Sequence, residues 1–462
     1  MKRPTRGVGR AKLAVLGAIA LSATLSATAG ATAGAAAGAA DGGIDGGGTG
    51  LQRESQSLAP RGDTKTSAGE QGRTATDAGK DALAATIDAY LRVDPKLTPE
   101  QAKAAAQGQD ARKELWDAVI AKNVHAFGGA WFDPRKNTLH VNATDESFAK
   151  AVLEEAGAAR LDVSTHLVAY SFDELDEVAG ALRSGKGELG EAADGRVGLD
   201  VPTNQVVVQV PSAEVEKAQK LAPRNVRVEA ATKQSVEADA CTDRNSCPDA
   251  VRAGSIMWKS SVGNDWCSVG ATALSSTTNR RYVLTAGHCV GANGESWGTA
   301  NRTVGTRWAQ RNSGDVDVAT IWVRNRPFSA QSNGDVWAQW QSDRAVDMDG
   351  VAPTQSWIWV GDTVCLAANY TDPDAVGNRC GVVGANSDAS VRGMTRVDGV
   401  DACGGDSGGG WYWLTSGGSR WGYGVHSRSD TGCNGSSGGD TSWFTTLPRV
   451  KGWIPSLGFE TQ

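Results

Sequence analysis

The cysteines of this chain are confined to its second half. All eight lie from Cys241 onward, and so do fourteen of the sixteen tryptophans, of which only Trp116 and Trp131 come earlier. A segment with eight cysteines can be held by disulfides, whereas a segment without any depends on its apolar core alone. The 462 residues therefore divide near residue 240 into two differently built parts.

The N-terminus has the order of a secretory signal peptide, which we assign to residues 1–35. A basic segment precedes an apolar run from Leu13 to Ala20, and small residues follow, with Ala27-Thr28-Ala29 and Ala31-Thr32-Ala33 as candidate cleavage sites. The alternative, a membrane anchor, is disfavoured because Ser, Thr and Gly dilute the run beyond Ala20. We therefore expect a secreted, extracellular protein with no membrane partner after removal of the signal. In that compartment an even number of cysteines indicates disulfides rather than metal ligands.

Residues 36–75 are rich in Gly, Ala, Ser, Thr and Asp, lack apolar periodicity and are predicted to form a disordered linker. Residues 76–235 alternate between helical and strand patterns, which indicates a compact α/β domain without a catalytic motif. Its predicted helices are Ala82–Leu91, Pro99–Ala121 with Thr98 as N-cap, Phe148–Ala158, Phe172–Leu182 and Ala213–Leu221. Its predicted strands are Ala130–Phe132 and Thr138–Ala143, joined as a hairpin, then His166–Tyr170, Gln205–Val210 and Asn225–Val228.

Residues 241–462 contain short β-rich runs separated by Gly, Asn, Asp and Ser, which is typical of an all-β sandwich or a pair of barrels. Examples are Cys267–Leu274, Tyr282–Thr285, Val318–Val323, Ser356–Val360, Gly381–Val383 and Tyr423–His426. The net charge of the whole chain is −6, so we expect no nucleic-acid partner.

One serine of this β-rich part lies in a glycine-rich loop, Gly405-Asp406-Ser407-Gly408-Gly409. A serine hydroxyl becomes a nucleophile only when a base takes its proton and donors stabilise the oxyanion. Glycines allow backbone N–H groups to approach such a serine closely. The same pattern occurs in ordinary surface turns, so a histidine and a carboxylate are needed to support the interpretation.

The β-rich part holds only two histidines, His288 and His426. His288 follows an apolar strand directly and precedes Cys289, which makes it a rigidly mounted candidate for the base. A general base of this kind needs a carboxylate that fixes its tautomer. Asp317 begins the apolar run that continues to Val323 and is favoured, while Asp315, two residues earlier, is the alternative because it can face the same side.

These three motifs, in this order, resemble those of the chymotrypsin-like serine peptidases. Thr285-Ala286-Gly287-His288-Cys289, the strand start at Asp317 and the loop around Ser407 carry the resemblance, which covers about residues 250–458. It implies two six-stranded antiparallel β-barrels with the catalytic groups between them. It further implies His288 as general base, Asp317 as its orienting carboxylate, Ser407 as nucleophile, and the N–H groups of Gly405 and Ser407 as the oxyanion hole.

The secreted bacterial branch of this family, which includes streptogrisin and alpha-lytic protease type enzymes, is the most similar. Cys267-Ser268-Val269-Gly270 and the layout of signal, long prosegment and small protease domain carry this likeness. It implies that residues 76–235 are a prosegment that assists folding and inhibits the enzyme; slow folding of a β fold with non-local contacts gives a reason to need one. The disulfides implied by the resemblance are Cys241–Cys247, Cys267–Cys289, Cys365–Cys380 and Cys403–Cys433.

The sequence departs from the family pattern around Asp406. Bacterial members often place an arginine at the position of Leu366 to pair with the aspartate before the serine. Because a buried unpaired carboxylate is costly, a cation is expected near Asp406, with Arg379 and Arg396 as the candidates.

Substrate specificity stays open between three predictions. The resemblance implies that the residue six before the nucleophile, here Asp401, lies at the base of the pocket, where a carboxylate would favour Arg or Lys. It also implies that the strand of His426 lines this pocket; His426, with Ser427, Arg428 and Ser429 near it, would instead suit an acidic side chain, or would neutralise Asp401. A small or apolar preference is the third possibility, and in each case the expected partner is a protein or peptide.

Two further functions remain as alternatives. The chain could be a protease-like binding module that uses Trp411, Trp413 and Trp421 as a platform, or the released prosegment could inhibit in trans. No metal or organic cofactor is implied by any motif.

Overall fold

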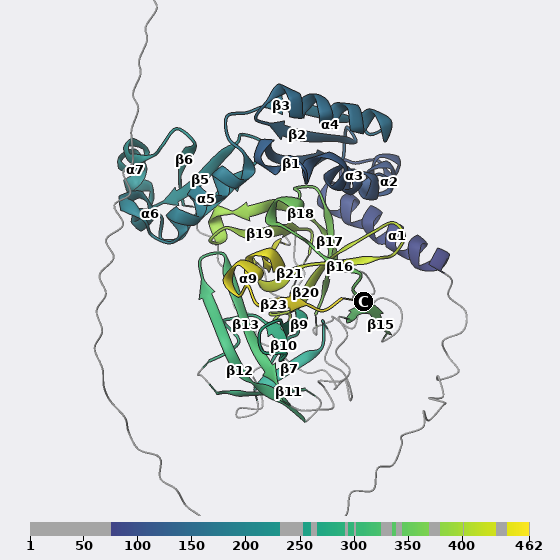
Figure 1. Ribbon diagram of the computed structural model, residues 1–462, viewed down its shortest axis with the longest axis vertical. Coiled ribbons are helices and arrows are strands. Elements are labelled where there is room, and N and C mark those ends of the chain that lie inside the picture. Colours follow the sequence, from purple (N-terminus) through teal and green to yellow (C-terminus); the bar gives the residue numbers. More distant parts are fainter. Residues whose placement is uncertain are drawn as a thin grey trace, which may run out of the picture. The chain divides into compact units, whose positions relative to one another are not determined.

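A computed structural model describes residues 75–231, 253–259, 266–291, 294–299, 302–324, 335–338, 344–368, 379–400, 402–430 and 441–461 (Figure 1). The predicted signal peptide, the predicted linker up to residue 74, and Cys241, Cys247, Asp401 and Cys433 lie outside these ranges. In the described ranges no helix has the length and apolar character needed to cross a membrane.

The N-terminal part, residues 75–231, is an α/β structure as expected from its alternating pattern. Its helices are α1 (Ala75–Val93), α2 (Pro99–Gln107), α3 (Gln109–Leu115), a π-helix (Trp116–Ile120), α4 (Glu146–Ala158), α5 (Phe172–Arg183), α6 (Gly187–Ala193) and α7 (Val215–Leu221), with short 3-10 turns at Val124–Ala126 and Ser212–Glu214. Its strands are β1 (Phe127–Asp133), β2 (Thr138–Ala143), β3 (Val163–Leu167), β4 (Val197–Asp200), β5 (Gln205–Val210) and β6 (Val226–Ala230).

Local sequence signals account for several of these boundaries. Thr98 caps α2 in a capping box, in which its side chain accepts from the N–H of Gln101 and the Gln101 side chain accepts from the N–H of Thr98. The single helix predicted over Pro99–Ala121 is instead divided, because α2 ends at Gly108 and the chain continues as α3 and a π-helix. Strand β3 also begins earlier than predicted, since its parallel pairing with β2 aligns Val163 with Leu139.

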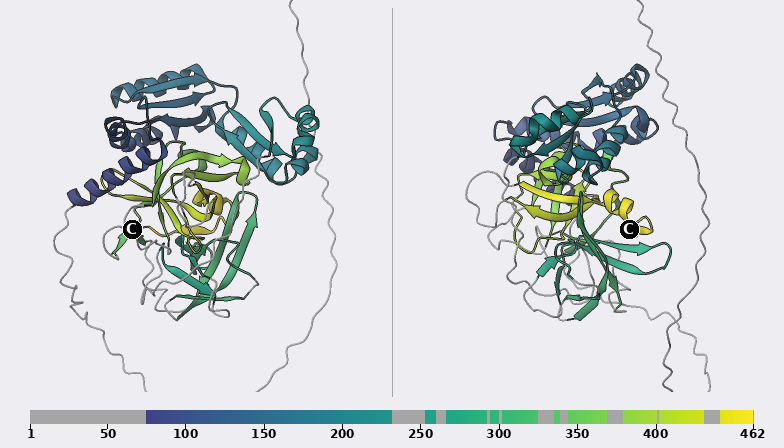
Figure 2. Two further views of the ribbon diagram at one scale, coloured as in Figure 1. Left: turned by 180° about the vertical axis from the view of Figure 1, so that it is seen from behind. Right: turned by 90° about the vertical axis from the view of Figure 1, so that its left-hand side faces the viewer.

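The N-terminal part contains the same arrangement twice. In one three-stranded sheet β1 pairs antiparallel with β2, and β2 pairs parallel with β3. In another three-stranded sheet β4, β5 and β6 repeat that order and those directions. A helix connects the parallel strands in each case: α4 connects β2 to β3, and α7 connects β5 to β6. Helix α4 packs on β2 and β3 (Figure 1, Figure 2).

The β-rich part, residues 253–461, forms two larger sheets and a hairpin. The first sheet has the order β23-β9-β10-β13-β12-β11-β7-β8. Its strands are β7 (Ile256–Lys259), β8 (Trp266–Ser268), β9 (Ala271–Ser275), β10 (Arg281–Thr285), β11 (Ser296–Thr299), β12 (Arg302–Ser313), β13 (Val316–Val323) and β23 (Leu457–Phe459). The hairpin is β14 (Asp335–Ala338) and β15 (Arg344–Asp347).

The second large sheet closes into a six-stranded barrel. Its order runs β21-β20-β17-β18-β19-β22, and β22 pairs back onto β21, while β16 adds to β21 in parallel. The strands are β16 (Gly350–Val351), β17 (Thr363–Ala367), β18 (Cys380–Asp388), β19 (Met394–Asp398), β20 (Gly410–Leu414), β21 (Arg420–Ser429) and β22 (Thr441–Thr446). Short 3-10 turns lie at Gln355–Trp357 and Ala389–Val391, and helix α9 (Leu447–Trp453) follows β22.

The structure confirms one prediction about the β-rich part in part and corrects another. Of the two six-stranded barrels expected, one is confirmed; the other unit is an eight-stranded sheet that no strand pairing of the described residues closes. The strand predicted at Ser356–Val360 is absent: residues 356 and 357 end a 3-10 turn, and Val360 makes only an isolated bridge to Trp131. Asp362 accepts a hydrogen bond from the N–H of Trp359 and holds the chain in a tight bend.

Apolar packing connects the N-terminal part to the barrel. One buried cluster includes Tyr90 and Trp116 from the N-terminal part together with Trp359 and Tyr423 from the barrel side. Hydrogen bonds accompany it: the Tyr90 hydroxyl donates to the Gly361 carbonyl at 2.9 Å, and the N–H of Phe132 donates to the Val360 carbonyl at 2.9 Å. The first sheet packs in two other clusters, one of which also includes Val425 of β21. The N-terminal part therefore shares its apolar core with the barrel.

Candidate active site

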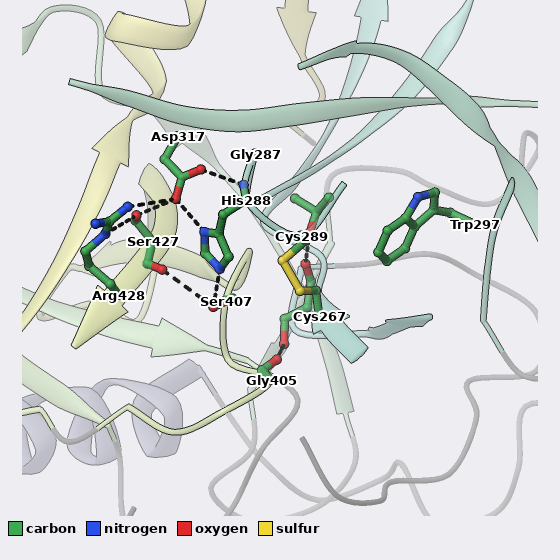
Figure 3. Close-up of a disulfide and its surroundings, with 12 residues drawn as sticks. Cys267, Gly287, His288, Cys289, Trp297, Asp317, Gly405, Ser407, Ser427 and Arg428 are labelled. Atoms are coloured by element: carbon green, nitrogen blue, oxygen red, sulfur yellow. Dashed lines mark hydrogen bonds and ion pairs between the residues drawn. A yellow bond between two sulfur atoms is a disulfide. The ribbon is translucent and has the colours of Figure 1, made fainter. Parts of the chain in front are cut away.

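His288 is mounted at the end of β10 by a glycine and a disulfide. Strand β10 pairs with β13, and the last pair in register joins Thr285 to Ala319. A Cβ on Gly287 would lie 2.2 Å from the carbonyl oxygen of Arg311 on β12 and 2.9 Å from Oδ1 of Asp317 on β13, so only glycine permits these two strands to approach this closely. Cys289 is bonded to Cys267 of β8, which fixes the chain on the other side of the histidine (Figure 3).

Asp317 lies on β13, has no exposed surface, and accepts three hydrogen bonds beside one nearby cation. Its Oδ1 accepts from the backbone N–H of His288 at 2.8 Å, and its Oδ2 accepts from His288 Nδ1 at 2.6 Å (Figure 3). The hydroxyl of Ser427, on β21 of the barrel, donates to the same Oδ2 at 2.5 Å, and the Arg428 guanidinium lies 3.8 Å from it. The carboxylate is thereby fixed by groups from both the first sheet and the barrel.

These contacts decide the charge of Asp317. Burial on its own raises the pKa of a carboxyl group, but the hydrogen bonds from His288 and Ser427 and the charge of Arg428 outweigh it and lower the pKa of Asp317 below its usual value. Asp317 is therefore a carboxylate near neutral pH and can only accept hydrogen bonds.

Ser407 lies in the loop between β19 and β20, on the barrel side of the boundary. The loop is tied to the first sheet, because the N–H of Ser268 donates to the Ser407 carbonyl and the Ser268 hydroxyl to the Gly405 carbonyl, both at 2.7 Å. Gly408, with φ of 89°, could carry no side chain, since a Cβ would lie 2.2 Å from Thr285 Oγ1. Ser407 Oγ is consequently brought to 2.9 Å from His288 Nε2.

The tautomer of His288 follows from its neighbours. Because ionised Asp317 only accepts, His288 Nδ1 carries the proton and donates to it. In the neutral ring Nε2 is then an acceptor, and the Ser407 hydroxyl donates to it. The arrangement can take a proton from Ser407 while the buried carboxylate stabilises the resulting imidazolium.

Two backbone donors beside Ser407 have no partner in the described part of the chain. The N–H groups of Asp406, Gly408 and Gly409 donate to the carbonyls of Cys403, His426 and Asp406. For the N–H groups of Gly405 and Ser407, the described residues provide no acceptor. They are the two groups predicted from the sequence to bind an oxyanion.

The cation beside Asp406 is Arg379. Its guanidinium is hydrogen-bonded to Asp406 Oδ2, which also accepts from the N–H of Cys403 at 2.8 Å. The other candidate, Arg396, pairs with Asp388 and Asp398 instead. Arg379 directly precedes Cys380, whose disulfide to Cys365 holds β17 to β18, so the barrel supplies the cation from an element distant in sequence.

The alternative carboxylate, Asp315, is placed elsewhere. It pairs with Arg183 of α5 at 3.3 Å and with Arg449 of α9 at 3.0 Å. Both arginines also pair with Asp176 of α5. Asp315 therefore belongs to an ionic cluster that links the N-terminal part to α9, and Asp317 is the carboxylate beside His288.

The residues predicted to line a substrate pocket lie in three different settings. Ser427 donates to Asp317, and the Ser429 hydroxyl donates to the Ala402 carbonyl at 2.8 Å. His426 is fully buried in the barrel, where Trp411 Nε1 donates to its Nδ1 at 3.3 Å. Asp401 lies outside the described residues.

The imidazole of His426 is kept neutral. Burial, followed by the electrostatic effect of the nearby His288 and Arg379, lowers the pKa of His426 from 6.5 to about 3. Trp411 Nε1 is only a donor, so Nδ1 accepts and the ring proton resides on Nε2. Nε2 is buried and has no partner among the described residues, which leaves a donor available to a further group.

His426 is expected to make folding pH-dependent. The pKa of His426 is about 3 in the folded chain and 6.5 in the unfolded chain. The free energy of unfolding is therefore highest above pH 6.5, and it decreases as the pH falls toward 3 and the unfolded chain takes up the proton. In a Ser407→Ala background, which prevents self-digestion, His426→Asn should reduce the loss of unfolding free energy between pH 7 and pH 4 by about 3 kcal/mol. Denaturant unfolding at the two pH values measures this, with exposed His125→Asn as control. Equal losses in the two variants would contradict it.

Four disulfides were predicted, and the described residues contain two of these pairs, Cys267–Cys289 and Cys365–Cys380. Cys403 is also disulfide-bonded, and its predicted partner Cys433 lies outside the described residues, as do Cys241 and Cys247. The described ranges contain no group of three or more His, Cys, Asp or Glu side chains placed to hold a metal ion.

Two supporting groups of the site were not predicted in their roles. The sequence predicts Ser427 in the pocket rather than beside Asp317, and it gives no sign of Thr445, whose hydroxyl accepts from the Asp317 N–H at 2.8 Å. Neither belongs to a local motif, so only the packing of β13 against β21 and β22 identifies them.

Comparison with known proteins gives limited similarity. No family model and no curated protein matches the chain. Among solved structures, an alpha-lytic protease homolog N4 is similar with 25% identity and a TM-score of 0.34, covering 45% of this chain and 98% of that one. Kallikrein-related peptidase 10 is similar with 16% identity and a TM-score of 0.26, covering 43% of this chain and 92% of that one.

Proposed function

We propose that this chain is the precursor of a secreted serine endopeptidase of the chymotrypsin-like class. The observation that carries the proposal is the position of one imidazole between a buried carboxylate and a serine hydroxyl. His288 lies 2.6 Å from Asp317 Oδ2 through Nδ1 and 2.9 Å from Ser407 Oγ through Nε2. This is the hydrogen-bonded order that nucleophilic catalysis by serine requires.

In the proposed reaction His288 Nε2 takes the proton of Ser407 as Oγ attacks the carbonyl carbon of the scissile peptide bond. The oxyanion that forms accepts hydrogen bonds from the N–H groups of Gly405 and Ser407, which have no other acceptor among the described residues. Imidazolium then gives its proton to the leaving amine, and an acyl-enzyme remains on Ser407. Water, deprotonated by the same ring, releases the acid and restores the serine.

Covalent labelling tests the proposal against a protease-like binding module. A fluorophosphonate is attacked only by an activated serine, so the processed protein should be labelled at Ser407 and lose peptide hydrolysis in proportion. The His288→Ala variant should not be labelled. Absence of labelling in a folded protein that still binds peptides would favour the binding module, for which the buried Trp411 and Trp413 offer no exposed platform.

The same proposal treats the N-terminal part as a prosegment. Its apolar core is continuous with that of the barrel, and its α5 reaches Asp315, two residues from Asp317. These contacts suit a segment that helps the barrel to form. Refolding residues 241–462 with and without the N-terminal part is the test, and equal recovery of activity would exclude the assisting role. The disulfides and the basic-apolar N-terminus suit export to an oxidising compartment.

The substrate side chain that the enzyme prefers is proposed to be either basic or acidic. The basic preference depends on Asp401 at the base of the pocket. The buried, unpaired N–H at His426 Nε2 favours the second candidate, because a donor of this kind suits the carboxylate of a glutamate side chain. Hydrolysis of otherwise identical chromogenic peptides ending in Arg, Glu or Phe decides between them, and a clear preference for Phe would exclude both.

A further inference from the structure

A lysine of the N-terminal part is buried in the barrel side of the molecule. Lys113, on α3, has a side chain that is 5% exposed, and its Nζ lies 2.6 Å from Asp362 Oδ2. It also donates to the Trp357 carbonyl. Lysine is almost never buried without a specific partner, so the surroundings of this ammonium group are informative.

Three aromatic rings surround the ammonium group. Nζ lies 4.4 Å from the ring centre of Trp357, 4.2 Å from that of Trp359 and 5.9 Å from that of Tyr423. An ammonium group within about 6 Å of a ring centre is attracted by the negative face of the ring, and the attraction increases when water is excluded. All three rings are almost completely buried.

The carboxylate of this cage is held in place without the lysine. Asp362 Oδ2 accepts from the backbone N–H of Trp359 at 2.8 Å and from the Tyr423 hydroxyl at 3.0 Å. Both donors belong to the barrel side, as do the three rings and the Trp357 carbonyl. The groups that contact the ammonium therefore form a preorganised receptor, and the N-terminal part supplies only the cation.

The neighbouring basic residue makes different contacts. Arg112, also buried on α3, donates to the Ala105 carbonyl and lies over the Phe132 ring, so it stays within the N-terminal part. Consecutive residues of a helix do not share a face, and of these two it is Lys113 whose side chain enters the cage. Burial lowers the pKa of Lys113 to about 8, and the Asp362 carboxylate opposes that effect, so the group is mostly charged at neutral pH.

We propose that Asp362, Trp357, Trp359 and Tyr423 form a binding site for a primary alkylammonium group, such as a lysine side chain, which Lys113 fills in the full-length chain. The site is separate from the candidate active site, since Tyr423 lies four residues before Ser427 on β21, about 13 Å along the strand. It requires neither hydrolysis nor processing, and a chain that lacks the Lys113 side chain should accept a free ligand in its place.

Chemical rescue tests this site in the full-length Ser407→Ala chain. Adding Lys113→Ala should lower Tm by about 10 °C, because Asp362 is left buried without its cation. n-Butylammonium should restore much of the loss in a saturable manner and change tryptophan fluorescence, whereas n-butanol of the same size should not. Lys113→Met, which keeps the length and removes the charge, should be destabilised but not rescued.

Two controls make the result decisive. Lys122→Ala removes a lysine outside the cage and should change neither Tm nor the response to n-butylammonium. Asp362→Asn combined with Lys113→Ala should abolish the rescue. If Lys113→Ala does not fold alone, refolding it with n-butylammonium or with n-butanol gives the same comparison. Equal effects of the two compounds, or rescue that survives Asp362→Asn, would overturn the proposal.

Discussion

Replacing Ser407 by alanine is expected to lower kcat for peptide hydrolysis by about a million-fold, because the remaining site has a base and oxyanion donors but no nucleophile. His288 Nε2, 2.9 Å from Ser407 Oγ, would then have no hydroxyl to activate. The variant should also accumulate as the full-length chain if processing is its own reaction. Initial rates with a chromogenic peptide and the mass of the purified protein measure the two effects.

A second serine provides the control for the Ser407→Ala variant. Ser276, on the surface, donates to the Ser456 carbonyl and has no contact with the site, so Ser276→Ala should retain normal kcat and processing. Activity of Ser407→Ala within about tenfold of the unaltered protein would contradict nucleophilic catalysis by this residue.

Replacing Asp317 by asparagine is expected to lower kcat by about 10⁴-fold with little change in KM. Asparagine has the shape of aspartate, but its amide would favour the wrong tautomer of His288 and could not stabilise the imidazolium. The pKa of Asp317 is held below its usual value, so the unaltered carboxylate acts as an anion throughout the neutral range. Steady-state kinetics on the processed enzyme separate kcat from KM.

Asp315 provides the control for that experiment. It lies two residues away on the chain, but it pairs with Arg183 and Arg449 rather than with His288. Asp315→Asn should leave kcat of the processed enzyme within a fewfold of normal, whereas it should loosen the N-terminal part in the precursor. A large loss of kcat in Asp315→Asn with normal activity in Asp317→Asn would reverse the assignment of the two carboxylates.

Local patterns predicted much of this molecule. The cap at Thr98 and the strand before His288 depend on residues near one another in sequence, and the structure has them close to the predicted positions. The choice of Arg379 over Arg396 beside Asp406 could not be predicted in this way, because it depends on how β17 and β18 place the segment before Cys380.

The sequence was least informative where long-range contacts decide conformation. The turn at Gln355–Trp357 looked like a strand from its apolar residues, yet Asp362 and Lys113 hold this region in a bend. The role of Ser427 likewise depends on β21 reaching Asp317 from the barrel. The eight strands of the first sheet include β23, from the end of the chain, which no local pattern near β9 reveals.

The backbone N–H of Asp317 donates to Thr445, so the strand that holds this carboxylate is fastened to the barrel that holds Ser407. The distance between the ring of His288 and the hydroxyl of Ser407 therefore depends on how the first sheet packs against the barrel. Any partner, mutation or solvent that shifts the first sheet against the barrel by about an ångström would lower the rate of hydrolysis by about 100-fold without unfolding either unit. An inhibitor that binds between the first sheet and the barrel and separates them need not resemble a peptide.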